Sequence, residues 1–334
     1  MKIFVQSSVF LPTPSPGAGA VEYLVAKLTQ GLAGRGHDVT LFALGGSDVP
    51  GVKLITVEPQ GSPAAREAGL VMHMTAEAVS AYPDVLFDHS LTQLAQKVFG
   101  PDLPAVSMSH GMAPLSPWAR NPAFTSRHHS RLHGRPEAQV LYNGVDVDAI
   151  PLGPPARDRQ QRLVWAGRIL PYKRPHVGLD WAWESHRPLV LAGPIVDADY
   201  FRREVEPRVR RAHPLAEYRG ELSHDALLAL FRDSAALIFT SDESEPFGIV
   251  MLEAMASGCP VLAYDAGANP EILLADVGRL VQNDEEAVQL LREGFWPASP
   301  PILCRNIVSQ HFGMDHMVES AEALLTRAVA EVLT

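Results

Sequence analysis

Short apolar runs alternate with amphipathic segments along most of the chain. Apolar runs of a few residues predict buried strands, and apolar residues three or four positions apart predict helices. In the first part of the chain, this spacing predicts a helix over Val21–Leu32. Strands that alternate with helices predict a parallel α/β sheet covered on both faces. The strands predicted here are Lys2–Val5, Val39–Leu44, Val85–Phe87, Ala105–Ser109 and Val140–Tyr142.

The same alternation starts again after a segment rich in proline and glycine. This segment runs from Asn143 to Pro155 and is typical of a domain boundary. We therefore predict an N-terminal domain over residues 1–146 and a C-terminal domain over residues 147–314. Apolar residues at helical spacing over Met314–Leu333 predict a long amphipathic helix. The strands predicted in the second domain are Leu163–Ala166, Leu189–Ala192, Ala235–Thr240, Pro260–Ala263 and Arg279–Val281.

Composition narrows the class of protein. The chain has 334 residues, of which 46% are hydrophobic and 20% charged, which is typical of a globular protein. Its net charge of −10 argues against nucleic acid as a partner, because phosphate backbones repel an acidic body. No apolar run is long enough for a membrane span, and we recognise no signal peptide at the start. Only two cysteines are present, so we expect a cytoplasmic protein without disulfides.

One segment of the second half combines glycine with two carboxylates. Residues 245–258 read EPFGIVMLEAMASG, follow a predicted strand and open a predicted helix that ends at Gly258. The first turn of a helix presents N–H groups and a positive dipole end, which suits phosphate. Glu253 lies roughly 7.5 Å along the helix axis at ~1.5 Å per residue, within reach of a ribose hydroxyl. It is the only charged residue between Pro246 and Asp265, so a solvated surface helix is a poor interpretation.

Two cations lie near the start of the second domain. Arg168 follows the predicted strand Leu163–Ala166, and Lys173, the only lysine after Lys97, opens the next predicted helix. Both positions belong to the carboxyl edge of an open α/β sheet, where ligands bind. A leaving nucleoside diphosphate develops negative charge, which an enzyme without a metal must balance with cations. Arginine and lysine both bind phosphate, as a planar fork and as a point charge.

These motifs resemble those of the retaining glycosyltransferases of family 4. The most specific part is the Glu245-to-Glu253 block, and the resemblance extends from about residue 2 to 282. It departs from the family at Ala20, where the family has a second glycine. The family implies a GT-B fold, in which two Rossmann-like domains face a central cleft and a C-terminal helix, 315–334 here, returns to the first domain. The other matching motifs are Gly19–Glu22, Ser109–Gly111, Tyr142–Asp146, Gly167-Arg168 and Lys173.

The resemblance also implies the activity. It implies transfer of a sugar from a nucleoside-diphosphate sugar to a hydroxyl acceptor, with retention at the anomeric carbon. In its front-face reaction, the departing phosphate takes the acceptor's proton, which explains why the sequence shows no convincing general base or covalent nucleophile. Neither a metal nor another cofactor is expected. The catalytic positions implied are Arg168, Lys173, Glu245 and His110, of which His110 follows a predicted strand. The donor-binding positions implied are Gly19, Phe247, Gly248, Ile249 and Glu253.

Three further clusters have the residue types of metal-binding or catalytic sites. Asp146-Val147-Asp148 has the spacing of metal ligands, but it lies within the interdomain motif. His128, His129 and His133 have no carboxylate or cysteine nearby, so we expect no metal site there either. Asp88-His89-Ser90 has the composition of a catalytic triad, but adjacent residues at a strand end point in different directions. We therefore expect no nucleophile among these three residues, but they could line the acceptor side of the cleft.

Other functions are compatible with part of this pattern. A nucleotide-sugar epimerase or hydrolase would use the same two-domain fold. A non-catalytic subunit that binds nucleotide sugars is a second alternative. A dehydrogenase is a weaker one, because Gly17-x-Gly19 matches only part of the dinucleotide motif and Glu22 replaces its third glycine. The sequence does not determine the base, the sugar or the acceptor.

Overall fold

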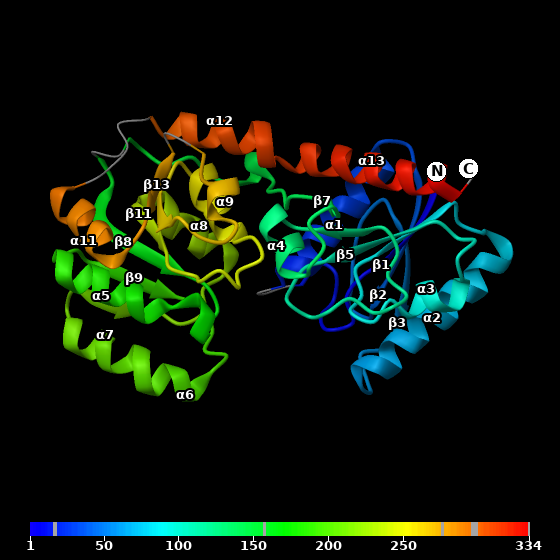
Figure 1. The fold of residues 1–334 in the computed structure, drawn as a ribbon, viewed down its shortest axis with the longest axis horizontal. Helices are drawn as coiled ribbons and strands as arrows, with labels where there is room; N and C mark the ends of the chain where they lie inside the picture. Colours follow the sequence, from blue (N-terminus) through cyan, green and yellow to red (C-terminus); the bar gives the residue numbers. More distant parts are fainter. Residues whose placement is uncertain (16–18, 156–157, 275–276, 295–299, 333–334) are drawn as a thin grey trace. The chain divides into compact units, whose positions relative to one another are not determined.

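The computed structural model describes residues 1–15, 19–155, 158–274, 277–294 and 300–332. They form two compact units (Figure 1). Unit 1 comprises Met1–Asn143 and Met314–Thr334, and unit 2 comprises Gly144–Gly313. Each unit is built on its own sheet, and the paired strands that the structure describes run parallel.

Unit 1 has a sheet with the strand order β3-β2-β1-β4-β5-β6-β7. Because β1 and β4 are adjacent and the chain order reverses between them, their carboxyl ends form a topological switch point, where α/β proteins bind ligands. The strands are β1 (Lys2–Gln6), β2 (Asp38–Leu44), β3 (Lys53–Val57), β4 (Val85–Asp88), β5 (Ala105–Ser109), β6 (Pro122–Phe124) and β7 (Gln139–Val140). The helices are α1 (Ala20–Gly34), α2 (Pro63–Ser80), α3 (Leu94–Phe99), α4 (Arg127–Leu132) and α13 (Met314–Val332).

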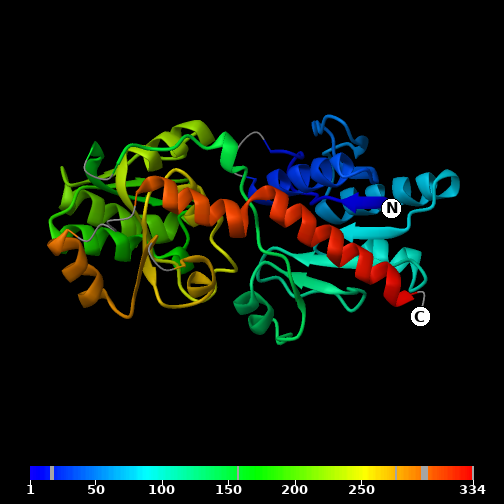
Figure 2. The ribbon, with the colours of Figure 1, turned by 90° about the horizontal axis from the view of Figure 1, so that it is seen from above.

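The last helix of the chain, α13, packs within unit 1 against α1 (Figures 1 and 2). Gly31 makes the close approach possible, because a Cβ atom built on it would lie 2.4 Å from Val318 Cγ2. Glu322 of α13 accepts hydrogen bonds from Arg35 Nε at 2.6 Å and pairs with His37 Nε2 at 2.8 Å. Apolar packing and these polar contacts together hold the C-terminal helix on the first unit.

Unit 2 has a sheet with the strand order β10-β9-β8-β11-β12-β13, so its switch point lies between β8 and β11. Its strands are β8 (Gln160–Ala166), β9 (Leu189–Ala192), β10 (Ala216–Tyr218), β11 (Ser234–Phe239), β12 (Val261–Tyr264) and β13 (Gly278–Val281). Its helices are η1 (Val147–Ala149), η3 (Pro171–Lys173), α5 (Pro175–Ser185), α6 (Ala198–Tyr200), η4 (Phe201–Val205), α7 (Glu206–Ala212), α8 (His224–Asp233), α9 (Ile249–Ala256), α10 (Asn269–Ile272), α11 (Asp284–Glu293) and α12 (Pro301–Phe312).

The predicted α/β fold with two parallel sheets is confirmed, and each predicted strand overlaps an observed one. The pattern missed β3, β6 and β10. Strands β3 and β10 lie at sheet edges, where one side faces solvent and the apolar signal is weak, and β6 and β10 have only three residues each. Strand β7 ends at Val140, two residues earlier than predicted.

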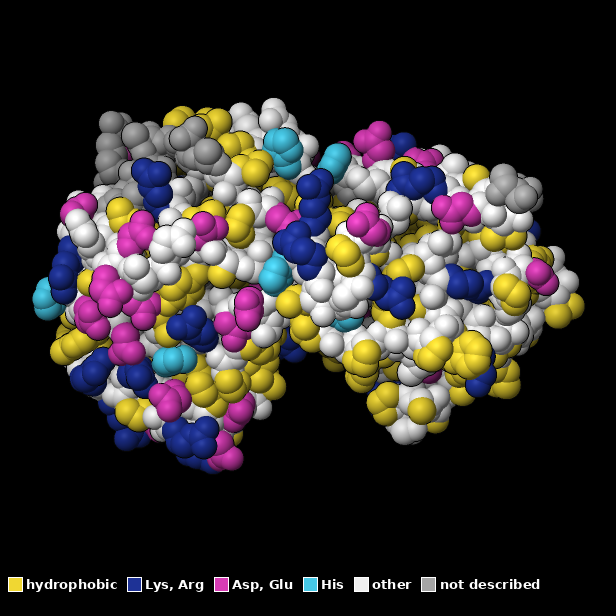
Figure 3. Space-filling view, viewed as in Figure 1, with side chains coloured by type: hydrophobic (Ala, Val, Ile, Leu, Met, Phe, Trp, Pro, Cys, Tyr) yellow, Lys and Arg dark blue, Asp and Glu magenta, His cyan; other side chains and the backbone are white. Residues whose placement is uncertain are grey.

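Several charged side chains on the surface of unit 2 form ion pairs with one another. Figure 3 shows acidic and basic side chains interspersed over the part of unit 2 that carries α5 to α7. There Asp180 pairs with Arg208 and Arg211, and Arg210 pairs with Glu206. Among the residues that the structure describes, no helix is both long enough and apolar enough to cross a membrane.

Candidate active site

Lys173 and Glu245 meet at the switch point of unit 2. Lys173 follows β8 and Glu245 follows β11, and these strands are parallel neighbours whose carboxyl ends emerge at one edge of the sheet. The Lys173 ammonium donates a hydrogen bond to Glu245 Oε2, and only 14% and 10% of the two side chains are exposed. The backbone ties the two loops together, since Asp242 N donates to Tyr172 O at 2.8 Å. The fold thus brings together two residues that are 72 positions apart in the sequence.

Aromatic rings surround the Lys173 ammonium. Its Nζ lies 5.4 Å from the ring centroid of Tyr172 and 6.0 Å from that of Phe239, the last residue of β11. Such rings stabilise a cation while they limit its access to water. Lys173 is the last residue of η3, two residues before α5, so the prediction that it opens a helix is wrong. The reason is Pro175, which starts α5 and disfavours helical geometry at Arg174, whose φ is +50°.

Arg168 lies on the same loop, but its side chain is exposed. Its Nη2 donates to the Tyr172 hydroxyl at 3.3 Å, which places the guanidinium beside the residue that precedes Lys173. Arg168 follows β8 by two residues, as the sequence predicts. The structure therefore holds Lys173 and Glu245 in direct contact and leaves Arg168 at the surface of the same edge.

Helix α9 begins at the same place. Gly248, its N-cap residue, has φ +88°, a conformation that favours glycine. A Cβ atom on Gly248 would also lie 2.6 Å from Phe239 Cζ, so the Phe239 ring contacts the start of α9 and also lies near Lys173. Phe247 is buried and packs edge-on to Phe312, at 6.2 Å between ring centroids. The first turn of such a helix has N–H groups without intrahelical partners, which suits an anion.

Glu253 lies on α9, one turn beyond its start, and is mostly buried. Its Oε1 lies 2.9 Å from Nε2 of His224, the first residue of α8. The hydrogen bond to the Glu253 carboxylate raises the pKa of His224, and burial opposes this shift. The sequence did not indicate His224, because a contact between residues 29 positions apart has no local signature.

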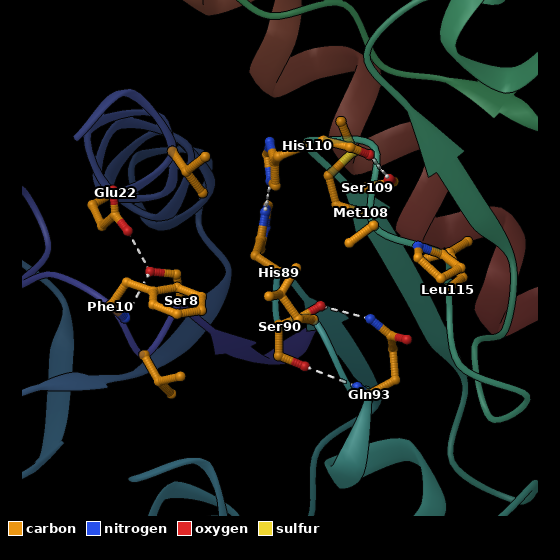
Figure 4. Close-up of a pocket in the computed structure, with 16 residues that line it drawn as sticks. Ser8, Phe10, Glu22, His89, Ser90, Gln93, Met108, Ser109, His110 and Leu115 are labelled. Carbon is orange, nitrogen blue, oxygen red and sulfur yellow. Dashed lines mark hydrogen bonds between the residues drawn. The ribbon is translucent and has the colours of Figure 1, made fainter. Parts of the chain in front are cut away.

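The predicted residues of unit 1 lie at its own switch point. His110 follows β5 and forms a hydrogen bond with His89, with 2.8 Å between His110 Nε2 and His89 Nδ1 (Figure 4). Burial lowers the pKa of His110 to about 4, and His129 contributes to this shift. Burial likewise lowers the pKa of His89 well below its usual range, with a smaller effect of His110. Both imidazoles are therefore neutral at pH 7.

Gly19 is the N-cap residue of α1 and leaves room for its neighbours. A Cβ atom on Gly19 would lie 2.3 Å from Ser15 Cβ and 2.9 Å from Glu22 Oε2. Glu22 is buried and accepts a hydrogen bond from the Ser8 hydroxyl. Gly17, of the predicted glycine loop, lies outside the described residues.

Metal-ligand clusters are absent from the described part of the chain, where no three His, Cys, Asp or Glu side chains gather in a suitable way. His129 and His133 pack edge to face, at 4.8 Å between ring centroids. The Asp146 side chain accepts a hydrogen bond from Ala149 N at 3.4 Å and caps η1.

Comparison with known proteins identifies the class of enzyme. Residues 153–293 match the family described as Glycosyl transferases group 1, and this range contains Arg168, Lys173, Glu245 and Glu253. Over 325 residues the chain is 25% identical to a GDP-mannose-dependent alpha-mannosyltransferase of Mycolicibacterium smegmatis, covering 82% of each protein. The structure matches that of AviGT4, a glycosyltransferase involved in avilamycin A biosynthesis, with a TM-score of 0.77 at 24% identity, over 99% of this chain and 98% of that one. The chain is a GT-B glycosyltransferase similar to family 4.

A further solved structure has the same fold as this glycosyltransferase. Anabaena HepE in complex with UDP-glucose matches with a TM-score of 0.70 at 18% identity, over 98% of this chain and 100% of that one. At this identity the match establishes the fold alone. The family match lies within unit 2, where the Glu245-to-Glu253 block connects the switch point to α9.

Proposed function

We propose that this glycosyltransferase transfers a sugar from a nucleoside-diphosphate sugar to a hydroxyl acceptor, with retention at the anomeric carbon and without a metal ion. The observation that carries the proposal is the convergence of Lys173, Glu245 and the start of α9 around the Phe239 ring. A cation, a carboxylate and free helical N–H groups at one switch point match the needs of a sugar diphosphate.

Each group has a distinct role in this proposal. The Lys173 ammonium, the Arg168 guanidinium and the first turn of α9 hold the diphosphate. Glu253 accepts hydrogen bonds from the ribose hydroxyls, and His224 fixes the orientation of its carboxylate. Glu245 and the backbone at Phe247 and Gly248 bind the hydroxyls of the donor sugar.

In the reaction, the bond between the anomeric carbon and the phosphate oxygen breaks. A new bond between the anomeric carbon and the acceptor oxygen forms on the same face of the sugar. The acceptor's proton passes to the departing phosphate oxygen, so no protein base has to remove it. Lys173 and Arg168 stabilise the charge that develops on the diphosphate, a contribution of about 10²-fold or more per group.

The named relatives support the donor class and the transfer reaction. The mannosyltransferase is named for its dependence on GDP-mannose, and HepE was solved with UDP-glucose. Both the family and this relative are named for glycosyl transfer, which favours a transferase over an epimerase, a hydrolase or a non-catalytic subunit. The contact of His110 and Gly19 with the donor stays a prediction from the sequence.

The test combines binding, product analysis and chelation. UDP-glucose, GDP-mannose and ADP-glucose are compared by thermal shift, because a bound donor raises stability by mass action. The preferred donor is then incubated with EDTA, and proton NMR follows the anomer of the sugar first released or transferred. We expect undiminished turnover with EDTA and a product with the donor's anomeric configuration. Inversion refutes the front-face step, loss of activity with EDTA refutes the metal-free mechanism, and no donor binding refutes the function.

A further inference from the structure

A pocket with a volume of about 120 Å³ opens at the switch point of unit 1 (Figure 4). Ser8, just beyond β1, and Glu22, in the first turn of α1, form one side of it. His89, beyond β4, and His110, beyond β5, form the other. Segments from three strands and one helix therefore aim polar groups at a single cavity.

The pocket contains an acid and no basic residue. The lining that the structure describes includes the Glu22 carboxylate and no lysine or arginine. Arg66 is nearby, but its Nη1 donates to Val9 O at 3.1 Å and it does not line the cavity. Both imidazoles are neutral at pH 7, because burial lowers the pKa values of His89 and His110. An anion in this pocket would therefore face a buried carboxylate with no cation to balance it.

The start of α1 does not supply the missing positive charge. A helix N-terminus attracts anions, but here Glu22 already lies in the first turn of α1. Its Oε2 lies so close to Gly19 that a Cβ atom on that glycine would be 2.9 Å away. The carboxylate therefore compensates the dipole of its own helix.

One buried polar atom in the lining lacks a partner. His89 is 4% exposed, and its Nε2 has no hydrogen-bond partner in the described structure. Its Nδ1 is engaged by His110, so Nε2 is either a donor or an acceptor, according to the tautomer. A hydroxyl group satisfies both cases, and it can also donate to Glu22, which only accepts. An ionised phosphate oxygen carries no proton, so it cannot donate a hydrogen bond to Glu22.

The pocket also has an apolar side. Phe10, which is 49% exposed, lines it, and so do Val9, Met108 and Leu115. The C–H face of a sugar or cyclitol ring packs well on such a surface, whereas its edge carries the hydroxyl groups that polar side chains bind.

We propose that this pocket binds the acceptor as an uncharged ring-shaped polyol, with its hydroxyl groups on Glu22, Ser8 and His89, and discriminates against phosphorylated acceptors. The proposal rests on the glycosyl-transfer function proposed above and names the chemical class of its acceptor. The Ser8 hydroxyl donates to Glu22, so it contributes to ligand binding as an acceptor. Ser90 and Gln93 contribute less, because Gln93 Nε2 already donates to Ser90 O at 2.6 Å and its Oε1 accepts from Ser116 N at 3.0 Å.

The experiment measures binding in the absence of donor. Protein with ¹⁵N-labelled histidine is titrated with glucose, mannose and myo-inositol, and with glucose 6-phosphate, mannose 6-phosphate and inositol 1-phosphate. We expect at least one free polyol to shift the His89 and His110 signals and to bind about tenfold or more tightly than its phosphate ester. A panel in which no polyol binds more tightly than its ester overturns the proposal.

Two variants locate the effect. Glu22→Gln keeps the shape of the side chain and removes its charge, so we expect the preference for the free polyol to fall severalfold. Glu67→Gln is the matched control, because Glu67, on α2, is also a buried glutamate of unit 1 but accepts from the Thr92 hydroxyl at 2.7 Å and does not line the pocket. An unchanged preference in Glu22→Gln contradicts the assignment. Donor binding, measured separately, distinguishes failure of this inference from failure of the proposed function.

Discussion

Replacing Lys173 by methionine separates the role of this lysine in catalysis from its role in folding. Methionine keeps an unbranched apolar stem near Tyr172 and Phe239 but removes the charge. The Glu245 carboxylate, whose side chain is 10% exposed, then loses the ammonium that donates to it. Both stability and turnover should fall, for different physical reasons.

The two effects have different expected sizes. Removing one partner of a fully buried ion pair costs about 3–5 kcal/mol. The Lys173–Glu245 pair keeps some contact with solvent, so we expect a loss of about 2–3 kcal/mol in the free energy of unfolding. Loss of a cation that stabilises the departing diphosphate lowers turnover by about 10²- to 10³-fold, which corresponds to roughly 2.7–4 kcal/mol in the barrier.

The double variant Lys173→Met/Glu245→Gln decides between these roles. It removes the unpaired charge, so its stability should return to within ~1 kcal/mol of wild type. Its turnover should stay at least as low as that of the single variant. Stability is measured by urea unfolding, and turnover by release of nucleoside diphosphate at saturating donor, well below the unfolding temperature.

Lys53→Met is the matched control. Lys53 forms an ion pair with Glu77, but 53% of its side chain is exposed, so we expect a stability change below ~1 kcal/mol and unchanged turnover. The reasoning is refuted if Lys173→Met retains turnover within about threefold of wild type. It is also refuted if the double variant regains turnover together with stability, because the lysine would then act only through folding.

Three further predictions concern two titratable side chains and one glycine with a positive φ. Burial raises the pKa of Asp88 from 3.8 to about 6, so the folded state disfavours the ionised form. Stability is therefore lost as the pH rises from about 4 to 6, and in urea unfolding Asp88→Asn should show a smaller loss over this range than wild type. The raised pKa of His224 stabilises the fold below pH 6.5, and this contribution is lost as the pH rises through the raised pKa; His224→Gln should remove it, and an unchanged pH profile would show that the contact with Glu253 is too weak to matter. Gly248→Ala should lower the free energy of unfolding by about 1–3 kcal/mol and weaken donor binding, because φ is +88° and the new methyl group has no room. Gly34→Ala, with open space around the new methyl group, should be neutral or stabilising by up to ~1 kcal/mol. Equal thermal stability of the two variants would contradict this reasoning.

The local pattern was sufficient for the central strands and for the long helices. Strands such as β1 and β11 are buried on both faces, so their continuous apolar runs are visible in the sequence. Helix α13 shows its apolar face at helical spacing over nineteen residues. The edge strand β3 was missed, because its exposed and half-buried residues give no such run.

The residues of the candidate site could be predicted only in part from the sequence. Lys173 stands out as the only lysine after Lys97 in an arginine-rich chain, and Glu253 as the only charged residue between Pro246 and Asp265. Glu245 stands out through its spacing from Glu253. Their partners do not stand out. The contact of Glu253 with His224 depends on how α8 and α9 pack, and that depends on the whole of unit 2.

The sequence by itself determined the two α/β sheets, the charged residues at the strand ends of unit 2 and the family resemblance, because these depend on short-range periodicity and spacing. Only the tertiary structure decided that Lys173 donates to Glu245, that α13 packs on α1 through Gly31, and that Glu22 shares a pocket with His89. Strand order places residues far apart in the chain at one edge of a sheet, and burial at that edge then sets their charge. Neither effect is encoded in any local stretch of residues.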